Sequence, residues 1–351
     1  MRNIMVVTLI IAMAAMASGE FSTGGSELLK FKGYVISTFN VYGEDLADGE
    51  PDNAFNVIAT IEWLPRLNDW VDAKIAFKSQ PTKYTGAYED LSLTTEDIAI
   101  NMHFTENFTF SMGHFKRPFC YNYTRSSSSM YFLDRAMLTG MIGDFGKRDI
   151  GANLNADFGI LDIDLAYTNG EGDNEPEDDD QKNFTARAVV RPVDGISIGA
   201  AFGTASEYSD STMQDAWSAT GMDFYATADL PLSNTSDLFF AGEYLILGDP
   251  DVDPDTDYTD ADAYALTLMA NFSLDGEVLQ AVRPAFRYEN CSPGYAGDTD
   301  PDNDESAIDF CLNLDLYSSK NTAQIGIRNY SGQAEDFDSY TDMYLGWRMK
   351  F

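Results

Sequence analysis

The sequence is poor in cysteine and in basic residues, and it has no long apolar run beyond its N-terminus. Three cysteines (Cys120, Cys291 and Cys311) cannot build a disulfide framework for a chain of 351 residues, and nothing selects one pair among them. The chain has only 22 Lys and Arg residues and 57 Asp and Glu residues. The resulting net charge of −35 repels phosphate backbones. After the first seventeen residues, no apolar stretch approaches the roughly 20 residues of a membrane-spanning helix. The composition therefore argues against a nucleic-acid binder and against a helical membrane bundle.

Sequence motifs of catalysis are also missing. The chain has two histidines, His103 and His114, and no third residue at an obvious spacing for a zinc site or a hydrolase triad. No glycine-rich phosphate loop follows a strand and opens a helix. We therefore expect neither an enzyme nor a resident metal centre or cofactor.

The N-terminal segment has the features of a secretory signal. Arg2 supplies a positive charge, residues 4–14 are almost all apolar, and Ala15 and Ala17 stand where a signal peptidase reads small residues. The sequence therefore predicts a signal peptide over residues 1–17. Cleavage after Ala17 would leave residues 18–351, in which we expect a single domain.

From residue 28 onward, stretches of about ten residues alternate apolar with polar or small side chains. At the C-terminus, Met343, Leu345 and Trp347 share one face of such a stretch, while Asp342 and Arg348 share the other. A period of two indicates β-strands. The pattern predicts sixteen strands, near residues 28–39, 54–64, 70–79, 95–104, 107–116, 148–157, 160–169, 182–192, 195–204, 219–230, 237–247, 262–274, 280–291, 306–317, 321–330 and 339–351.

The connections between these stretches alternate between short and long. The long ones run over 40–53, 80–94, 117–147, 170–181, 205–218, 248–261, 292–305 and 331–338. Tight turns at one rim and long loops at the other are typical of an antiparallel up-and-down β-barrel. A barrel of sixteen strands is too wide for side chains to fill, so the polar face must line water and the apolar face must contact lipid. A soluble barrel would need the opposite arrangement.

These features predict an all-β transmembrane protein of the Gram-negative outer membrane. Aromatic residues near strand ends, such as Trp63, Trp70 and Tyr167, would lie in the two interfacial girdles of the barrel. The terminal Phe351 resembles the assembly signal of Gram-negative outer-membrane proteins. We therefore expect outer-membrane lipid and lipopolysaccharide to surround the apolar face.

The acidic residues concentrate in the long connections. Six of these connections (40–53, 170–181, 205–218, 248–261, 292–305 and 331–338) contain about half of all Asp and Glu residues and no Lys or Arg. Oxygen-rich segments such as 177–180 and 298–305 could bind calcium loosely, although they lack the pattern of an EF-hand loop. The alternative is a solvated, repulsive surface without a bound ion.

The basic residues are distributed differently. Eleven fall on or next to the face that would line the lumen: Lys30, Lys32, Lys74, Lys78, Arg187, Arg191, Arg283, Arg287, Arg328, Arg348 and Lys350. Six more lie in or beside the third long connection: Lys116, Arg117, Arg125, Arg135, Lys147 and Arg148. Seven acids also share the lumenal face: Asp97, Asp162, Asp164, Asp223, Asp229, Asp309 and Asp315.

Two explanations compete for these bases. A base that faces hydrocarbon near the midplane costs about 2–4 kcal/mol, so stability alone would turn the strand residues inwards. This cost does not explain the six bases in or beside the connection 117–147. A long connection does not face lipid, and the other long connections show that it could have been acidic. Rings of Arg and Lys are typical of an anion pathway, because charge-assisted hydrogen bonds replace lost hydration.

The segment 111–159 resembles the signature region of the phosphate-selective porin O and P family. The matching residues run Gly113-His114-Phe115-Lys116-Arg117-Pro118-Phe119, then Tyr131-Phe132-Leu133-Asp134-Arg135-Ala136, then Arg148-Asp149-Ile150-Gly151. The resemblance implies a trimeric outer-membrane porin of sixteen strands, whose third loop folds into the channel and narrows it. It also implies that Lys116, Arg135 and Arg148 contact anions at the constriction. Asp134 stands where the family usually has glutamate, and the acidic mouth is a second departure.

The sequence thus predicts a passive diffusion channel for small hydrophilic solutes, with phosphate-like anions favoured at the constriction and no covalent chemistry. Two alternatives stay open. In a general or cation-leaning porin, the acidic mouth would set the selectivity. In a structural or adhesive barrel, the pore would be plugged and the acidic loops would bind surface partners through divalent ions.

Overall fold

The computed structural model of the chain describes residues 30–43, 53–84, 87–173, 175, 180–208, 216–248, 261–292, 304–332 and 339–351. The signal peptide expected over 1–17 lies outside the described residues. Most of the acidic connections also lie outside them, so the expectations that concern these segments stay predictions.

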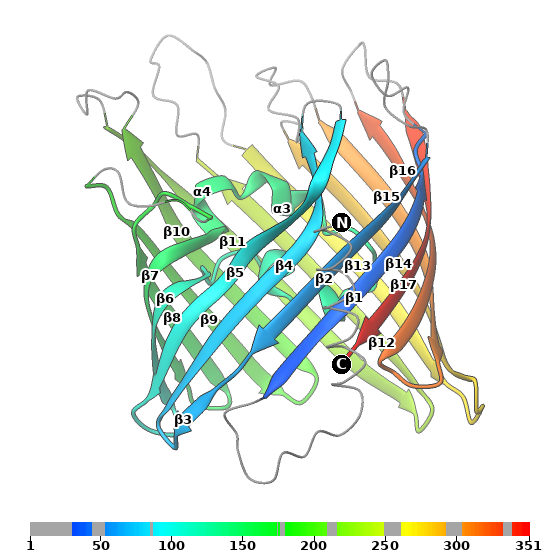
Figure 1. The fold of residues 1–351 in the computed structure, drawn as a ribbon, viewed down its shortest axis with the longest axis horizontal. Helices are drawn as coiled ribbons and strands as arrows, with labels where there is room; N and C mark the ends of the chain where they lie inside the picture. Colours follow the sequence, from blue (N-terminus) through cyan, green and yellow to red (C-terminus); the bar gives the residue numbers. More distant parts are fainter. Residues whose placement is uncertain are drawn as a thin grey trace.

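One antiparallel sheet closes on itself to form a barrel (Figure 1). Its strands are β1 (Phe31–Val41), β2 (Asn53–Trp63), β3 (Arg66–Asn68), β4 (Val71–Tyr84), β5 (Ala87–His103), β6 (Phe108–Lys116), β7 (Arg148–Asp157), β8 (Leu161–Thr168), β9 (Asn183–Val193), β10 (Ile196–Tyr208), β11 (Ala216–Ser233), β12 (Ser236–Leu247), β13 (Ala261–Ser273), β14 (Leu279–Ser292), β15 (Glu305–Leu316), β16 (Asn321–Gly332) and β17 (Tyr340–Lys350). β17 pairs with β1 and so closes the barrel. β3 is a three-residue strand in the turn between β2 and β4, and the other sixteen strands confirm the sixteen that the alternation predicts.

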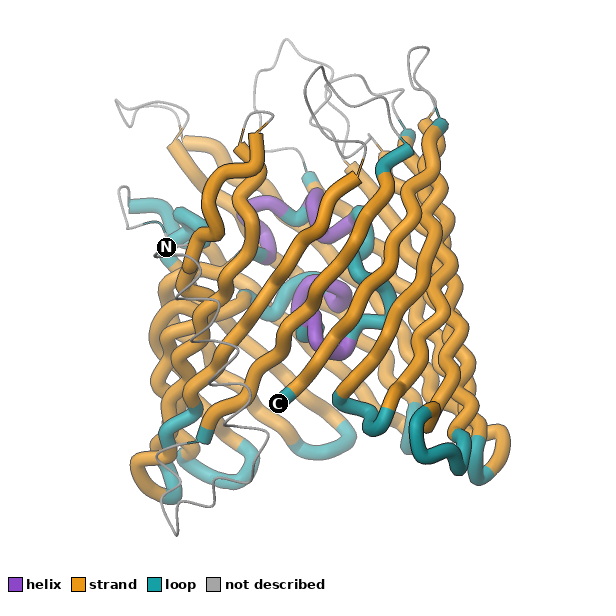
Figure 2. The backbone as a smooth tube through the Cα atoms, turned by 45° about the vertical axis from the view of Figure 1, so that its right-hand side comes forward, coloured by secondary structure: helices purple, strands orange, loops and turns teal. Residues whose placement is uncertain are grey.

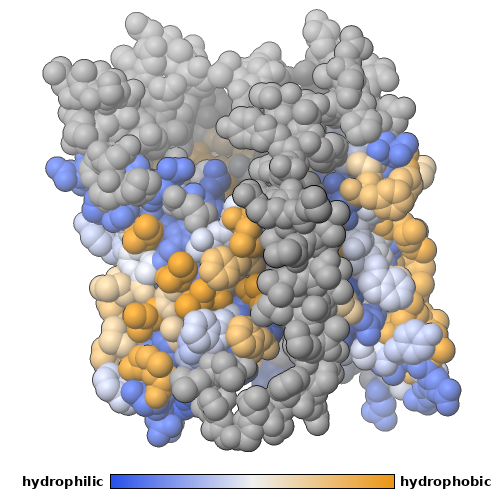
Figure 3. All heavy atoms as spheres, in the orientation of Figure 1, coloured by the Kyte–Doolittle hydropathy of each residue, from blue (hydrophilic) through white to orange (hydrophobic). Residues whose placement is uncertain are grey.

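The strand register places apolar side chains on the outer surface. Across the closing pair of strands, Phe39 opposes Leu345 and Ser37 opposes Trp347. Leu345 and Phe310 are each 55% exposed, as expected for residues that face lipid. Figure 3 shows apolar side chains over the middle of the barrel, between hydrophilic side chains towards its two ends.

Several strands are longer than the alternation predicts, and β4 and β5 differ most in what they replace. β4 continues to Tyr84 and β5 begins at Ala87, so the long loop expected over 80–94 is wrong. Proline lacks a backbone donor and usually indicates the end of a strand. Here Pro81 nevertheless opposes Leu91 within the pairing of β4 with β5. The tertiary pairing therefore overrides the local turn signals of this segment.

A β-bulge interrupts the same pair of strands. Ala76 opposes Asp97 and Phe77 opposes Thr95, which leaves Glu96 without an opposing residue. A bulge inserts one extra residue into a strand and re-aims its side chain. Consequently, two consecutive acids, Glu96 and Asp97, lie on the lumenal side, where strict alternation would turn one of them towards lipid.

The third long connection, residues 117–147, lies inside the barrel (Figure 2) and confirms the predicted inward-folded loop. It contains α2 (Tyr121–Thr124), the 3₁₀ turn η2 (Ser127–Ser129), α3 (Leu138–Met141) and α4 (Gly143–Gly146). No helix in the described part of the chain is long and apolar enough to cross a membrane. The apolar side chains of the loop, among them Phe119, Leu138, Ile142 and Phe145, pack on small wall residues that include Ala201, Ala205, Ala219, Ala263, Ala265 and Ala307. The inward loop, as we call residues 117–147, is thus packed against the wall.

The three cysteines lie on different parts of this structure. Cys120 belongs to the inward loop, Cys291 to β14 and Cys311 to β15. Their side chains are buried and none forms a disulfide. The pairing that the sequence left open therefore does not occur here.

Candidate channel constriction

The first part of the inward loop is fixed to strands β9 to β12. The Arg117 guanidinium, in a residue that is 1% exposed, donates to Thr185 Oγ1 at 2.9 Å. The backbone N–H of Asn122 donates to a carboxylate oxygen of Glu243 at 3.1 Å. A second wall carboxylate, Asp223, accepts from the preceding backbone N–H at 3.2 Å. The polar groups at the start of α2 are therefore satisfied by the wall.

The middle of the inward loop is fixed to strands β15 to β17. The Tyr131 carbonyl accepts from Asn313 Nδ2 at 3.0 Å and from Gln324 Nε2 at 3.2 Å. The Met130 carbonyl accepts from Arg348 Nη1 at 2.5 Å. Because the loop is anchored from β9 round to β17, it leaves space mainly beside β1 to β7.

Two cavities lie beside the inward loop. One, of about 320 Å³, is lined by residues of β1 to β7 and of the loop. The other, of about 640 Å³, is lined by residues of β4 to β7, of the loop and of β15 to β17, together with Asp173. Both cavities are lined by Glu96, Lys116, Ser127, Arg135 and Arg148. These five residues therefore border both cavities, and we call them the constriction.

Two bases of the constriction donate to uncharged oxygens. Lys116 Nζ donates to the Tyr123 carbonyl at 2.9 Å. Arg135 donates to the carbonyls of Tyr123 and Arg125 at 3.0 and 2.9 Å, and to Ser127 Oγ at 3.1 Å. Burial lowers the pKa of the Arg135 side chain from its ordinary value, but a guanidinium remains charged at neutral pH. In the part of the chain that the structure describes, neither base forms an ion pair with a carboxylate.

The third base, Arg148, belongs to a chain of ion pairs across the wall. The chain alternates Lys32, Glu62, Lys74, Asp97, Arg148 and Glu96 on β1, β2, β4, β5 and β7, with successive N···O distances of 3.1, 3.8, 2.6, 3.0 and 3.3 Å. Three bases and three acids alternate, so their charges cancel. Arg148 therefore faces the passage as part of a neutral network, which we call the wall ion chain.

Three other bases predicted for the constriction lie elsewhere. Arg117 faces the wall behind the inward loop. Arg125 lies over the rings of Tyr131 and Phe239, with its guanidinium carbon 5.3 and 5.7 Å from the ring centroids, and lines neither cavity. Lys147 is exposed and lines only the larger cavity.

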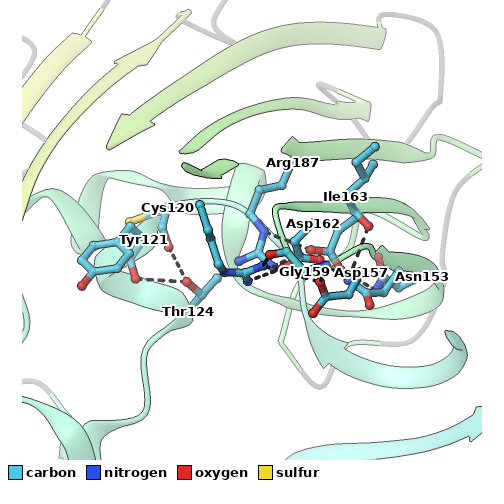
Figure 4. Close-up of polar contacts among 12 residues, drawn as sticks. Cys120, Tyr121, Thr124, Asn153, Asp157, Gly159, Asp162, Ile163 and Arg187 are labelled. Carbon is cyan, nitrogen blue, oxygen red and sulfur yellow. Dashed lines mark hydrogen bonds and ion pairs between the residues drawn. The ribbon is translucent and has the colours of Figure 1, made fainter. Parts of the chain in front are cut away.

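Most bases of the predicted lumenal wall are ion-paired. Arg187 pairs with Asp164, Arg191 with Asp162, Arg283 with Asp315, Arg287 with Asp309, and Arg328 with Glu289. Figure 4 labels Arg187 and Asp162, which lie on the neighbouring strands β9 and β8, and it also labels Thr124 and Cys120 of the inward loop, where Thr124 Oγ1 donates to the Cys120 carbonyl. Of the remaining wall bases, Lys32 and Lys74 belong to the wall ion chain, Lys78 lines the larger cavity, Arg348 anchors the loop, and Lys30 and Lys350 lie near the rim with short turns.

The two cavities together have more bases than acids. Their bases are Lys74, Lys78, Lys116, Arg135, Lys147, Arg148 and Arg328, and their acids are Glu62, Glu96, Asp97, Asp173 and Glu305. The passage therefore has a small positive excess, in a protein whose net charge is −35. A low-dielectric wall focuses such a field along the passage.

Sequence reasoning placed Asp97 on the lumenal face, but it missed Glu62, Glu96 and Glu243. Glu62 follows the alternation of β2 and could have been placed in the lumen beside Lys32. Glu96 and Asp97 are consecutive charges in an apolar alternation, and this pattern signals a bulge because one of them would otherwise face lipid. Glu243, which accepts from the inward loop, has no local signal, since its role depends on a partner about 120 residues away.

The described residues include no group of three or more His, Cys, Asp or Glu side chains that could hold a metal ion. The acidic segments near 177–180 and 298–305 lie mostly outside the described residues, so loose calcium binding there stays a prediction. The smaller cavity is lined by hydroxyls and amides beside the charged groups, as suits hydrated solutes in transit.

Comparisons with known proteins agree with this geometry. The family described as phosphate-selective porin O and P matches residues 68–300. Among solved structures, OmpT of Vibrio cholerae in its trimer form has a TM-score of 0.60 and 12% identity, over 92% of this chain and 99% of that chain. An anion-selective porin from Comamonas acidovorans has a TM-score of 0.59 and 9% identity, again over 92% and 99% of the two chains. OmpF of Salmonella typhi, in complex with daunomycin, has a TM-score of 0.59 and 14% identity, over 93% and 98%. No curated protein matches the sequence.

At these identities, the likeness to solved structures shows the fold alone. The family match is stronger evidence, because it spans residues 68–300 of 351 and includes the whole inward loop. The protein is a channel of the Gram-negative outer membrane, through which small hydrophilic solutes diffuse. The chain belongs to the phosphate-selective porin O and P family.

Proposed function

We propose that this channel prefers anions, and that Lys116 and Arg135 attract them at the constriction. The observation that carries this proposal is the excess of bases over acids around two neighbouring cavities, in a protein with a net charge of −35. Both side chains donate to uncharged oxygens, so their charge acts on the passage. In a narrow passage, charge-assisted hydrogen bonds replace part of the hydration that an anion loses.

Phosphate-like oxyanions are the class of solute that fits best. Arg135 supplies positive charge, and hydroxyl groups beside it can donate to the oxygens of an oxyanion. Thr124, Ser126 and Ser127 line the smaller cavity together with Arg135. The description of the family as phosphate-selective supports the same class. The solute would cross unchanged, without a catalytic step.

We also propose a homotrimer whose remaining apolar surface contacts outer-membrane lipid and lipopolysaccharide. The apolar outer face of the strands supplies a surface for both kinds of contact. OmpT of Vibrio cholerae, which has the same fold, is described in a trimer form.

The alternatives differ in what the acidic connections do. A cation-leaning porin is favoured by the concentration of acids in six connections and opposed by the basic excess around the cavities. An adhesive barrel would need a plugged lumen, and two cavities of about 320 and 640 Å³ that share lining residues favour a conducting pore instead.

The proposal is tested by Lys116→Gln in the purified protein in planar bilayers. The reversal potential in a KCl gradient should show an anion-to-cation permeability ratio about two- to fivefold below wild type, because one nearby charge is removed. Lys320→Gln is the matched control. It removes the same charge at a short turn, lines neither cavity and should leave the ratio unchanged. An unchanged ratio in Lys116→Gln, or an equal loss in both variants, would overturn the proposal.

A further inference from the structure

We infer that Asp97 limits the anion selectivity of the channel, by neutralising two bases that face the passage. The inference rests on the proposed anion preference and adds a residue that acts against it. Asp97 is an acid that lines the smaller of the two cavities. Its removal should therefore change selectivity in the direction opposite to the removal of a constriction base.

The contacts of Asp97 support this role. One carboxylate oxygen lies 2.6 Å from Lys74 Nζ and the other lies 3.0 Å from Arg148 Nε. Asp97 is 5% exposed and Arg148 is 7% exposed, so water screens this pair weakly. Lys74, Asp97 and Arg148 all line the smaller cavity. The carboxylate therefore cancels positive charge at the wall of the passage itself.

No other acid of the wall ion chain has this position. Glu62 joins Lys74 only at 3.8 Å and pairs more closely with Lys32, at 3.1 Å. Glu96 contacts Arg148 at 3.3 Å. Asp97 makes the two shortest contacts in the chain and is the acid that links its two halves.

The β-bulge between β4 and β5 explains why two acids reach Arg148. Without the extra residue, Glu96 and Asp97 would point to opposite sides of the sheet. With it, Arg148 has a second carboxylate and stays in place when Asp97 loses its charge. An asparagine at position 97 can still accept from Arg148, so its main effect is electrostatic.

The experiment measures the reversal potential of Asp97→Asn in a KCl gradient. We expect an anion-to-cation permeability ratio about two- to fivefold above wild type, because one negative charge beside the passage is lost. Asp164→Asn is the matched control. Asp164 is also 5% exposed and pairs with Arg187, but it lines neither cavity, so its ratio should stay close to wild type. A ratio that stays constant or falls in Asp97→Asn, or that rises equally in the control, would overturn the inference.

Two further variants separate charge from structure. Asp97→Glu keeps the charge and should keep the wild-type ratio. Asp97→Asn combined with Lys74→Gln restores the charge balance and should return the ratio towards wild type, whereas a structural defect would not be rescued by a second substitution. If Asp97→Asn fails to raise the ratio while Lys116→Gln still lowers it, the inference fails and the proposed function stands. If neither variant changes the ratio, the proposed function fails as well.

Discussion

Arg135 faces the passage and holds the inward loop with the same guanidinium. Its Nη1 donates to the carbonyls of Asn122 and Tyr123, and its Nη2 donates to the Arg125 carbonyl and to Ser127 Oγ. These acceptors span α2 and the start of η2, so one side chain bridges two turns of the loop. Since none of the acceptors is charged, Arg135 retains its full positive charge towards the cavities.

We expect the two roles of Arg135 to separate in two substitutions. Arg135→Ala should lower the anion-to-cation permeability ratio and raise the single-channel conductance, because both the charge and the bridge are lost. Arg135→Lys should keep most of the selectivity but give a noisier current, since lysine retains the charge and loses the planar fork. Single-channel recordings in planar bilayers measure both quantities. Equal loss of selectivity in the two variants would contradict this division.

At the scale of elements, the inward loop packs where the wall lacks side chains. A Cβ added at Gly221 would lie 3.0 Å from both the Phe119 and the Phe145 ring, and one added at Gly203 would lie 3.2 Å from Phe119. The two rings stack with their centroids 5.9 Å apart. Glycine weakens a strand, and a close approach of another group explains its presence in one. The missing side chains at Gly203 and Gly221 therefore leave the space that the two rings occupy.

A larger side chain at Gly221 should displace the inward loop from the barrel wall. Gly221→Val places branched carbons where the two rings lie, and overpacking of this kind costs about 1–3 kcal/mol. We expect a larger, noisier conductance with weaker anion selectivity, measured in planar bilayers. Gly242→Val serves as the control, because Gly242 lies on β12 away from the inward loop and its added Cβ would lie 3.3 Å from Leu266. A wild-type current in Gly221→Val would show that the position of the inward loop does not depend on the contact of Gly221 with the two rings.

The sequence predicted the strands well and the loop contacts poorly, for a physical reason. Alternation is a local pattern. The outward face of residues such as Leu345 and Trp347 can therefore be assigned from their sequence neighbours, without information on the strands that pair with them. The contact of Asn122 with Glu243 joins residues 121 positions apart and leaves no local pattern. Lys116, Arg135 and Arg148 were found through the family signature, but the neutralisation of Arg148 by Asp97 required the register of β4, β5 and β7.

At the scale of the whole molecule, the two signs of charge are separated. Six connections contain about half of all acids and no base, while the cavities inside the barrel have a basic excess. The strands that these connections join end at the rim opposite the short turns, so we expect the acidic charge at one end of the channel. A solute would then meet a negative potential at that end and a positive one at the constriction.

This separation should make the measured selectivity depend on the direction of a salt gradient. We call the six acidic connections the acidic rim. The Debye length is about 30 Å at 0.01 M and about 3 Å at 1 M, so the charge of the acidic rim attracts cations and repels anions in a dilute solution and is screened in a concentrated one. With oriented channels, the anion-to-cation permeability ratio should be lower when the dilute side faces the acidic rim than when it faces the short turns. The constriction bases are largely buried and contribute equally in both orientations.

Divalent ions provide the control for this last prediction. Carboxylate clusters attract calcium, so millimolar calcium on the side of the acidic rim should neutralise part of its charge and reduce the difference between the two orientations. Addition of a chelator should restore the difference. Calcium on the side of the short turns should have less effect, because the concentrated acids lie at the opposite end. Equal ratios in both orientations, with and without calcium, would mean that the acidic connections do not influence permeation, and selectivity would then depend on the constriction alone.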